Sequence, residues 1–427
     1  MKRVALFLAG IIYLVSCSDL DPVVVDNPIT VSSPSPTEQI WAVGLNDTQS
    51  GYVAAGNDMS FEFLGKIYDG KNLICSPLSL QYVMSMVANG AKGETLDEIV
   101  DFLGYGKDGI DALNEYSRIL LEQLPAVDLD VTLKATNALL VNDRYSLLPV
   151  YKNTVEKNYY AAVDNMDFSD PNQMAARINE WVRTNTNGFI DKVLDPSEIS
   201  TNSFAYIMNS LYFKAKWGNN ALGTIFKEEN TKSESFQRHN GRTAKVDMMN
   251  STGYHCYSIM DGYKVLALPY SNGKFNMYVL LPDENDIEGL IETLQVTAWS
   301  DILGSLKSDA MVYVKLPKFD IENKFSLKDV LNKLGIKKAF SPSLAEFEGM
   351  LENDNDSFSI DDVIQKSKIS VTEWGTEAGS VTTTNFCGSS LNEPQNEVYF
   401  YADHPFVFVI GEKTSETILF TGVVMQP

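Results

Sequence analysis

The sequence is poor in the residues that form most catalytic and metal-binding sites. It has three histidines and four cysteines in 427 residues. Neither an H-E-x-x-H nor a C-x-x-C spacing occurs, so the sequence predicts no metal site. No G-x-S-x-G elbow accompanies His239, His255 or His404. His404 precedes an apolar run and is typical of a turn or strand-entry residue rather than a catalytic base. We therefore expect a protein that is not an enzyme and needs no cofactor.

Positive charge is also scarce. The chain has 34 Lys and Arg against 56 Asp and Glu, a formal net charge of −22. Because binding to nucleic acid needs clustered basic side chains that neutralise phosphates, we expect no nucleic-acid partner. The glycines of "YGKDG" (105–109) are not followed by Lys-Ser/Thr, which excludes a phosphate-binding loop of that type. Acidity of this degree favours a soluble monomer.

The first seventeen residues have the layout of a secretory signal peptide. Lys2 and Arg3 precede an apolar run (4–15) that is too short to span a bilayer. The run leads into "LVSC", which resembles the lipobox of bacterial lipoproteins, where the cysteine, here Cys17, becomes the acylated first residue. We therefore expect a secreted lipoprotein whose lipid anchor holds it to the outer membrane of a Gram-negative bacterium. Whether it faces the periplasm or the cell surface stays open.

Residues 18–37 contain four prolines and four serines and lack helical periodicity. This composition predicts a flexible tether between the lipid and the domain. An ordered first strand through "VVV" is the alternative.

Three cysteines remain beyond Cys17: Cys75, Cys256 and Cys387. An odd number without close spacing predicts neither a disulfide framework nor a zinc site. We expect Cys75 and Cys256 to be small buried hydrophobic residues, and Cys387 to be exposed.

Helical patterns occur early and strand patterns dominate later. Capped apolar segments predict helices at 60–68, 78–90, 95–104 and 170–188. Runs rich in β-branched and aromatic residues predict strands, among them "SFAYIMNSLYFKAKW" (203–217), "YKVLALPY" (263–270) and "KFNMYVLLP" (274–282). Since no repeat or internal linker divides the chain, we expect one α+β domain over 38–427 with large mixed or antiparallel sheets.

Several stretches resemble signatures of the serpin family, in the family's order and spacing. They are "NLICSPLSLQYVMSMVANGAKGETLDEI" (72–99), "MNSLYFKAKW" (208–217), "YFYADHPFVFVI" (399–410) and "LFTGVVMQP" (419–427). The stretch "EWGTEAGSVTTTNF" (373–386) resembles the serpin hinge and reactive loop. The resemblance runs from about residue 40 to the C-terminus. It implies a single domain with three β-sheets, about eight or nine helices, a reactive loop at about 373–398 and a metastable native state.

The resemblance also implies a suicide inhibitor of proteases. In that family the protease attacks the reactive loop and forms an acyl-enzyme. The cleaved loop then enters the main sheet as a new strand and carries the attached protease with it. Inserting about 14 residues at roughly 3.3 Å each would move the attached end by about 46 Å. The alternative is a non-inhibitory serpin that acts as a carrier or as a binding module that stabilises another protein.

The alternation of strand side chains tests this reading. One face of the inserted strand would present Thr376, Ala378, Ser380, Thr382, Thr384 and Phe386, and the other Glu377, Gly379, Val381, Thr383, Asn385 and Cys387. The first set carries no charge and mostly small side chains, so it can enter a packed sheet without burying an unpaired charge. The alternative of a plain edge strand explains neither the preceding glycine nor the loop that follows.

The resemblance assigns roles to single residues. The hinge comprises Glu373, Gly375, Thr376, Ala378, Gly379 and Ser380. The shutter beneath the opening sheet comprises Ser76, Ser79, Asn209 and Gln365, where many animal members have histidine in place of Gln365. Trp217 matches the tryptophan at the breach, the top of the sheet where insertion begins. Trp374 departs from the family, which usually has a charged residue there, and is expected to slow insertion or pin the hinge.

The spacing from the hinge places the scissile bond between Ser389 and Ser390. Counting back from "FYADHPF" leaves a shift as far as Asn392 open. "FCGSS" contains no Lys, Arg or Asp. Trypsin-like and caspase-like targets are therefore disfavoured, whereas elastase-like or subtilisin-like serine proteases fit the small residues. Papain-like cysteine proteases would accept Phe386 or its neighbours.

Overall fold

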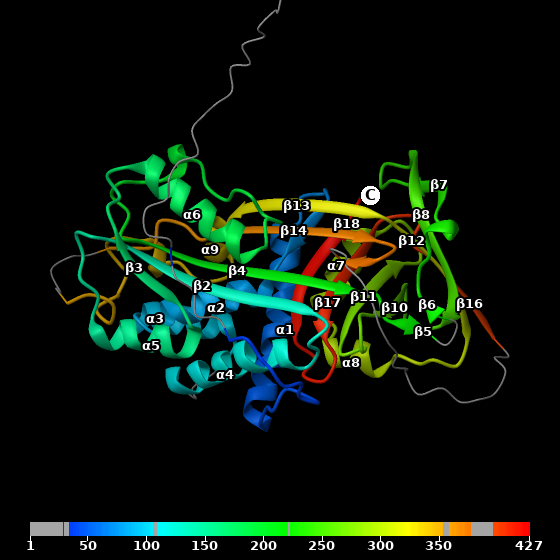
Figure 1. Cartoon of the computed structure of the whole chain (residues 1–427), viewed down its shortest axis with the longest axis horizontal. Coiled ribbons are helices and arrows are strands. Elements are labelled where there is room, and N and C mark those ends of the chain that lie inside the picture. The colour runs from blue at the N-terminus through cyan, green and yellow to red at the C-terminus, as the bar shows by residue number, and fades with distance from the viewer. Residues whose placement is uncertain (1–28, 30–33, 106–108, 221–222, 353–357, 377–395) are drawn as a thin grey trace, which may run out of the picture.

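The computed structural model describes residues 29, 34–105, 109–220, 223–352, 358–376 and 396–427 (Figure 1). Within these ranges it contains nine α-helices and three large β-sheets, which confirms the α+β prediction. The predictions for the signal peptide and for most of the tether lie outside the described residues. Ile29 is described, and its half-buried side chain packs against apolar residues around α6 (Pro171–Asn185).

The remaining helices are α1 (Asp47–Ile67), α2 (Pro77–Ala88), α3 (Gly93–Leu103), α4 (Ile110–Gln123), α5 (Pro149–Tyr159), α7 (Ile287–Leu294), α8 (Trp299–Gly304) and α9 (Lys328–Lys333). Local sequence explains several boundaries. In α6, the Asp170 carboxylate accepts hydrogen bonds from the Asn172 and Gln173 amides, and Pro171 occupies the first turn. The helix ends at Asn185, and Gly188 follows with a left-handed φ of 78°.

The main sheet has the strand order β13 (Phe319–Ser326), β14 (Ile364–Thr372), β15 (Gly375–Thr376), β4 (Ala205–Lys216), β2 (Thr132–Asn142) and β3 (Ala162–Met166). The second sheet has the order β1 (Leu73–Cys75), β18 (Ile418–Val424), β17 (Phe406–Glu412), β11 (Phe275–Pro282), β10 (Tyr263–Pro269) and β9 (Cys256–Ile259). The third sheet has the order β16 (Glu397–Tyr401), β12 (Met311–Pro317), β8 (Thr243–Tyr254) and β7 (Lys232–Gln237). A short hairpin joins β5 (Asn219–Asn220) to β6 (Gly223–Thr224).

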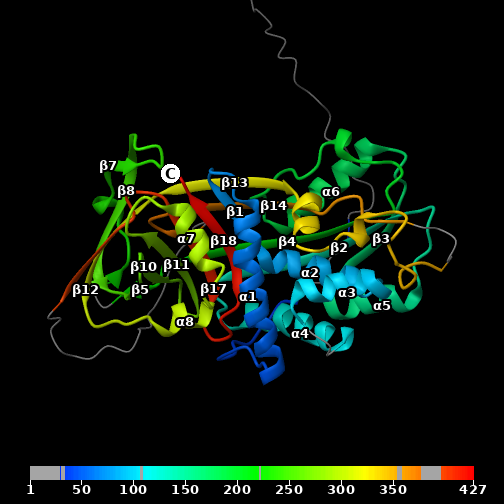
Figure 2. The ribbon, with the colours of Figure 1, turned by 180° about the vertical axis from the view of Figure 1, so that it is seen from behind.

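The main sheet is covered on both faces. On one face α2, all of whose residues are buried, packs between β4 and β18. Helices α1 to α5 lie on this side of the molecule, as Figure 2 shows. On the other face α6 places Ile178 and Trp181 against Leu140 and Ala138 of β2. The strands of the main sheet therefore lie between two apolar layers, and any widening of the sheet must disturb both.

The cysteine prediction is correct for Cys75 and wrong for Cys256. Cys75 is free and fully buried, and burial raises the pKa of its thiol to about 12. Cys256 is half-buried at the start of β9 and forms a disulfide bond. An odd number of cysteines without close spacing predicted no disulfide framework. Such a number does not prevent a single disulfide bond between distant positions. The described part of the chain shows no cluster of residues suited to a metal ion, and none of its helices is long and apolar enough to cross a membrane.

Protonation of His255 should make the fold sensitive to acid. Burial lowers the pKa of His255 from 6.5 to about 4. Below pH 6.5 the unfolded chain takes up a proton that the folded chain refuses, so stability is lost as the pH falls from 6.5 to about 4. The loss amounts to about 3 kcal/mol. Urea unfolding at pH 7 and pH 4 should therefore show a smaller acid loss for His255→Leu than for the wild type. His239→Leu, at an exposed position, is the control, and equal losses in all three chains would contradict the assignment.

Candidate functional site

In the part of the chain that the structure describes, two residues join the halves of the main sheet at its centre. Gly375 and Thr376 form β15, which pairs antiparallel with Thr372 and Val371 of β14 and with Lys216 and Ala215 of β4. Beyond this pair, the described residues include no ladder between β14 and β4. Within the part of the chain that the structure describes, the two strands are therefore joined through β15 at one end.

A small cavity of about 10 Å³ lies in this unpaired region. Leu211 of β4 and Ile369 of β14 line its two sides, and Thr376 lies at its upper limit. Phe189 contributes from the α6 face and Phe420 from the core face, so the cavity reaches through the sheet.

Gly375 is the tightest point of the closure. Its φ is 131°, a region essentially restricted to glycine. A Cβ at this position would lie 2.2 Å from the Ala215 carbonyl oxygen and 2.6 Å from the Lys216 Cα. The hinge prediction for Gly375 therefore corresponds to a position where both conformation and contact require glycine.

Glu373 and Trp374 hold the hinge from the side. The Glu373 carboxylate is almost fully buried, accepts a hydrogen bond from the Thr231 hydroxyl at 2.7 Å and lies 3.1 Å from the Lys318 ammonium. Burial alone would raise the pKa of Glu373, but the hydrogen bond from Thr231 and the nearby Lys318 charge hold it below its ordinary value. Trp374 is exposed, and its indole N–H donates to Glu228 at 3.1 Å. If Trp374 restrains the hinge, as predicted from the sequence, it does so through this hydrogen bond to Glu228.

At the breach, an aromatic stack contacts the inserted end of the hinge. The ring of Trp217 lies parallel to that of Tyr270 at 4.7 Å, and its indole N–H donates to the Thr372 carbonyl at 2.8 Å. The Tyr270 hydroxyl shares a hydrogen bond with Thr376, whose side chain is buried. Burial raises the pKa of Tyr270 well above its ordinary value, so the phenol stays neutral. Thr376 is thus buried at the breach, and the alternation predicted beyond it lies outside the described residues.

The shutter contains a reciprocal pair between Gln365 and Ser76. The Ser76 amide donates to Gln365 Oε1 at 3.0 Å, and Gln365 Nε2 donates back to the Ser76 carbonyl at 2.8 Å. The Ser76 hydroxyl donates to the Leu419 carbonyl and also accepts from the Ser79 amide, which caps the start of α2. An amide can both donate and accept, and here Gln365 does both. This pair ties β14 to the helix beneath it.

Asn209 lies on the opposite side of the opening. Its Nδ2 donates to Asn137 Oδ1 at 2.8 Å, and Asn137 in turn donates to the Tyr159 carbonyl. Asn209 Oδ1 is buried and has no hydrogen-bond partner among the described residues. The contacts described do not join Asn209 to Gln365. Among the described residues, the Ser76–Gln365 pair and the Asn137–Asn209 pair of the shutter are therefore not joined. In the second pair, Asn209 Oδ1 is a hydrogen-bond acceptor without a partner.

The structure brings Glu373, Gly375, Thr376, Trp217, Ser76, Ser79, Asn209 and Gln365 to the two ends and the floor of one opening. Ala378, Gly379, Ser380, Ser389, Ser390, Asn392 and Cys17 lie outside the described residues, so their predicted roles stay predictions. Sequence reasoning missed Tyr270, Thr231 and Asn137. Tyr270 is the last residue of the predicted strand "YKVLALPY". A tyrosine next to a turn gives only a weak indication that its hydroxyl group forms a buried hydrogen bond with a distant side chain.

Comparison with known proteins identifies the class. A family model described as Serpin (serine protease inhibitor) matches residues 54–427. The chain is 33% identical over 377 residues to an uncharacterized serpin-like protein of Thermococcus kodakarensis, covering 88% of this chain and 85% of that protein. It is 31% identical over 374 residues to serine protease inhibitor 42Dd of Drosophila melanogaster, covering 86% and 94%. The crystal structure of the thermophilic serpin tengpin in its native state has a TM-score of 0.79 at 28% identity, covering 93% of this chain and 98% of tengpin. The protein belongs to the serpin family, whose members are generally protease inhibitors rather than enzymes.

Replacing Gly375 by alanine should open the closed end of the sheet. The added methyl group clashes with the Ala215 carbonyl and strains the backbone by about 1–3 kcal/mol. Hydrogen–deuterium exchange of peptides covering 370–376 should then be about ten times faster or more, since each 1.4 kcal/mol is about a factor of ten. Gly262→Ala is the matched control, because Gly262 also has a left-handed φ but has open space around it. Unchanged exchange in Gly375→Ala would show that the two-residue closure is not held by this contact.

Proposed function

We propose that this serpin is a suicide inhibitor that traps a protease as an acyl-enzyme by inserting its cleaved reactive loop between β14 and β4. The observation that supports this most directly is the partly closed main sheet. Two hinge residues already pair with both flanking strands, and no ladder between described residues joins those strands beyond them. The region between β14 and β4 thus begins where the proposed reactive loop begins, at the end of β15.

The observed register extends naturally along this opening. Both pairings of β15 are antiparallel, with Thr376 opposite Val371 and Ala215. Six residues further along the loop correspond to six residues back along each neighbouring strand. Thr382 would therefore lie opposite Gln365 on one side and Asn209 on the other, on the same face as the buried Thr376.

This register gives the unused acceptor of the shutter a partner. A threonine hydroxyl between the two amides can donate to Asn209 Oδ1 while it accepts from a neighbouring donor. A buried acceptor without a partner costs about 1–3 kcal/mol. Insertion would remove this cost and add two ladders of backbone hydrogen bonds. The native state would then lie above the inserted state in free energy, as a trapping mechanism requires.

The same loop sequence favours inhibition over a carrier role. The inward-facing set from Thr376 to Phe386 carries no charge, so no step of insertion buries an unpaired ion. The small residues proposed around Ser389 and Ser390 suit an elastase-like or subtilisin-like serine protease. Phe386 would also allow a papain-like cysteine protease.

The site of action follows from the N-terminus. Residues 1–17 would direct export, and acylation of Cys17 would anchor the chain to the outer membrane, facing the periplasm or the cell surface. The disulfide at Cys256 supports an exported protein, because such bonds persist in oxidising compartments. An anchored inhibitor would intercept proteases that reach the cell envelope.

Incubation with pancreatic elastase or subtilisin tests the proposal. A denaturing gel should show a covalent band heavier than either partner, and the cleaved inhibitor should melt at a higher temperature than the intact one. A carrier serpin would yield cleaved chains without the heavy band. If the cleaved chain melts no higher than the intact chain, insertion does not occur and trapping is excluded.

Thr376→Arg should convert the inhibitor into a substrate. Thr376 is buried against Tyr270, so arginine places an unpaired charge on the inward face at a cost of several kcal/mol. The heavy band should fall at least about tenfold while cleavage of the loop continues. Glu377→Arg, which the alternation places on the outward face, should trap like the wild type. Equal trapping by both variants would contradict the alternation.

A further inference from the structure

A polar groove runs between α4 and α5, on the face of the molecule opposite α6. The two helices are in contact and lie side by side in Figure 2. The groove has a volume of about 590 Å³, within the range of sites that hold small ligands. Asp111, Glu115 and Arg118 line it from α4, and Lys157 lines it from α5. The three positions on α4 share one helix face because they are three or four residues apart.

The charges in the groove are sorted by sign. The hydroxyl of Tyr160, directly after α5, donates to the Glu122 carboxylate near the end of α4 at 2.5 Å, so the C-terminal ends of the two helices meet. The acidic residues lie in the first half of α4, whereas Arg118 and Lys157 lie nearer these ends. Seven residues of helix, from Asp111 to Arg118, span about 10 Å. The groove is therefore acidic at one end and basic at the other.

Three of the four charges lack an ionic partner. Arg118 lies 3.2 Å from Glu122, on the same helix. Asp111, Glu115 and Lys157 form no ion pair with any residue that the structure describes. The groove thus presents two unpaired carboxylates at one end and an unpaired ammonium at the other.

Amide and hydroxyl side chains lie between the two ends. Asn114 is almost fully buried, and its side chain exchanges two hydrogen bonds of 2.8 Å with the side chain of Asn89. Asn153, Thr154 and Asn158 line the groove from α5. Such groups both donate and accept hydrogen bonds, as the peptide units of a ligand require. Because Asn89 fixes Asn114, this part of the groove is formed before any ligand binds.

We propose that this groove binds short peptides with free ends. The N-terminal ammonium of a tripeptide would lie beside Asp111 and Glu115, and its C-terminal carboxylate beside Arg118 and Lys157. An extended tripeptide is about 10 Å long, at roughly 3.3 Å per residue, which matches the separation of the charges. The polar side chains between the ends would form hydrogen bonds with its peptide units.

Short peptides are the products of proteolysis. The ligand would therefore be most abundant where the targets of a protease inhibitor are active. The groove contains none of the residues that carry the proposed inhibition, so the two proposals are independent.

Equilibrium dialysis of labelled triglycine against the intact full-length chain tests the proposal. Triglycine should bind at one site per chain. N-acetyltriglycine lacks the ammonium and triglycine amide lacks the carboxylate, so each should bind about fivefold more weakly, the upper effect of a partly exposed ion pair. Lys157→Met should weaken binding of triglycine by a similar factor and leave binding of triglycine amide unchanged. Asp111→Asn should weaken binding of triglycine and leave binding of N-acetyltriglycine unchanged.

A matched control and a second measurement locate the site. Lys152→Met should bind triglycine as the wild type does, because Lys152 is an exposed lysine of α5 that pairs with Glu156 and does not line the groove. Hydrogen–deuterium exchange within 110–123 and 149–159 should slow when triglycine binds. Absence of binding, or equal binding of the three peptides, would overturn the proposal. Binding that survives both Asp111→Asn and Lys157→Met unchanged would place the peptide elsewhere and overturn it as well.

Discussion

The structure depends on one incomplete hydrogen-bond ladder. Gly375 and Thr376 pair with both β14 and β4 at one end of the main sheet, and the described residues form no ladder between these two strands along the rest of their length. Backbone groups in a sheet are strongly favoured to pair, and apolar strands in the middle of a domain are strongly favoured to touch. Among the described residues, neither preference is satisfied between β14 and β4 beyond this pair. The surrounding groups, from the Trp217 stack to the Ser76–Gln365 pair, hold the sheet in this state.

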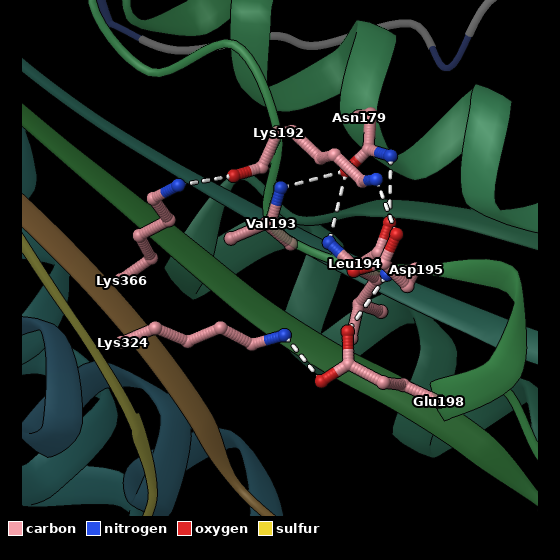
Figure 3. A network of polar contacts seen from close by, with 8 residues as sticks. All are labelled: Asn179, Lys192, Val193, Leu194, Asp195, Glu198, Lys324 and Lys366. Atoms are coloured by element: carbon pink, nitrogen blue, oxygen red, sulfur yellow. Dashed lines mark hydrogen bonds and ion pairs between the residues drawn. The ribbon is translucent and has the colours of Figure 1, made fainter.

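The opening has different chemistry on its two faces. The core face carries neutral amides and hydroxyls, which can exchange partners without a change in charge. The α6 face is apolar over β2 but carries ion pairs over β13 and β14, Lys324 with Glu198 (Figure 3) and Lys366 with Glu322, and water can replace these contacts. A strand that enters between them needs an uncharged side on the core face only. If residues 376–386 enter as a strand, as proposed above, alternation would meet this requirement by putting Glu377 and Asn385 on one side and the small residues on the other.

The sequence predicted the elements of this arrangement better than their contacts. The helix at 170–188 could be predicted because the residues that cap it are its neighbours in the sequence. The structure places α6 at 171–185. The inward direction of Thr376 follows from simple alternation. Tyr270, however, meets Thr376 across 106 residues, and Asn137 meets Asn209 across 72. Nothing local in the chain marks such partners. The disulfide of Cys256 was missed for the same reason, since an isolated cysteine gives no sign of a distant partner.

On the α6 face of the main sheet, lysines of β13 and β14 lie against carboxylates. Lys324 is 2.5 Å from Glu198, and Lys366 is 2.6 Å from Glu322. These side chains are partly exposed, so dissolved ions weaken their attraction. The distance over which charges act shrinks from about 30 Å in very dilute salt to about 8 Å in physiological salt. The ion pairs on this face therefore hold their strands less firmly as the ionic strength rises.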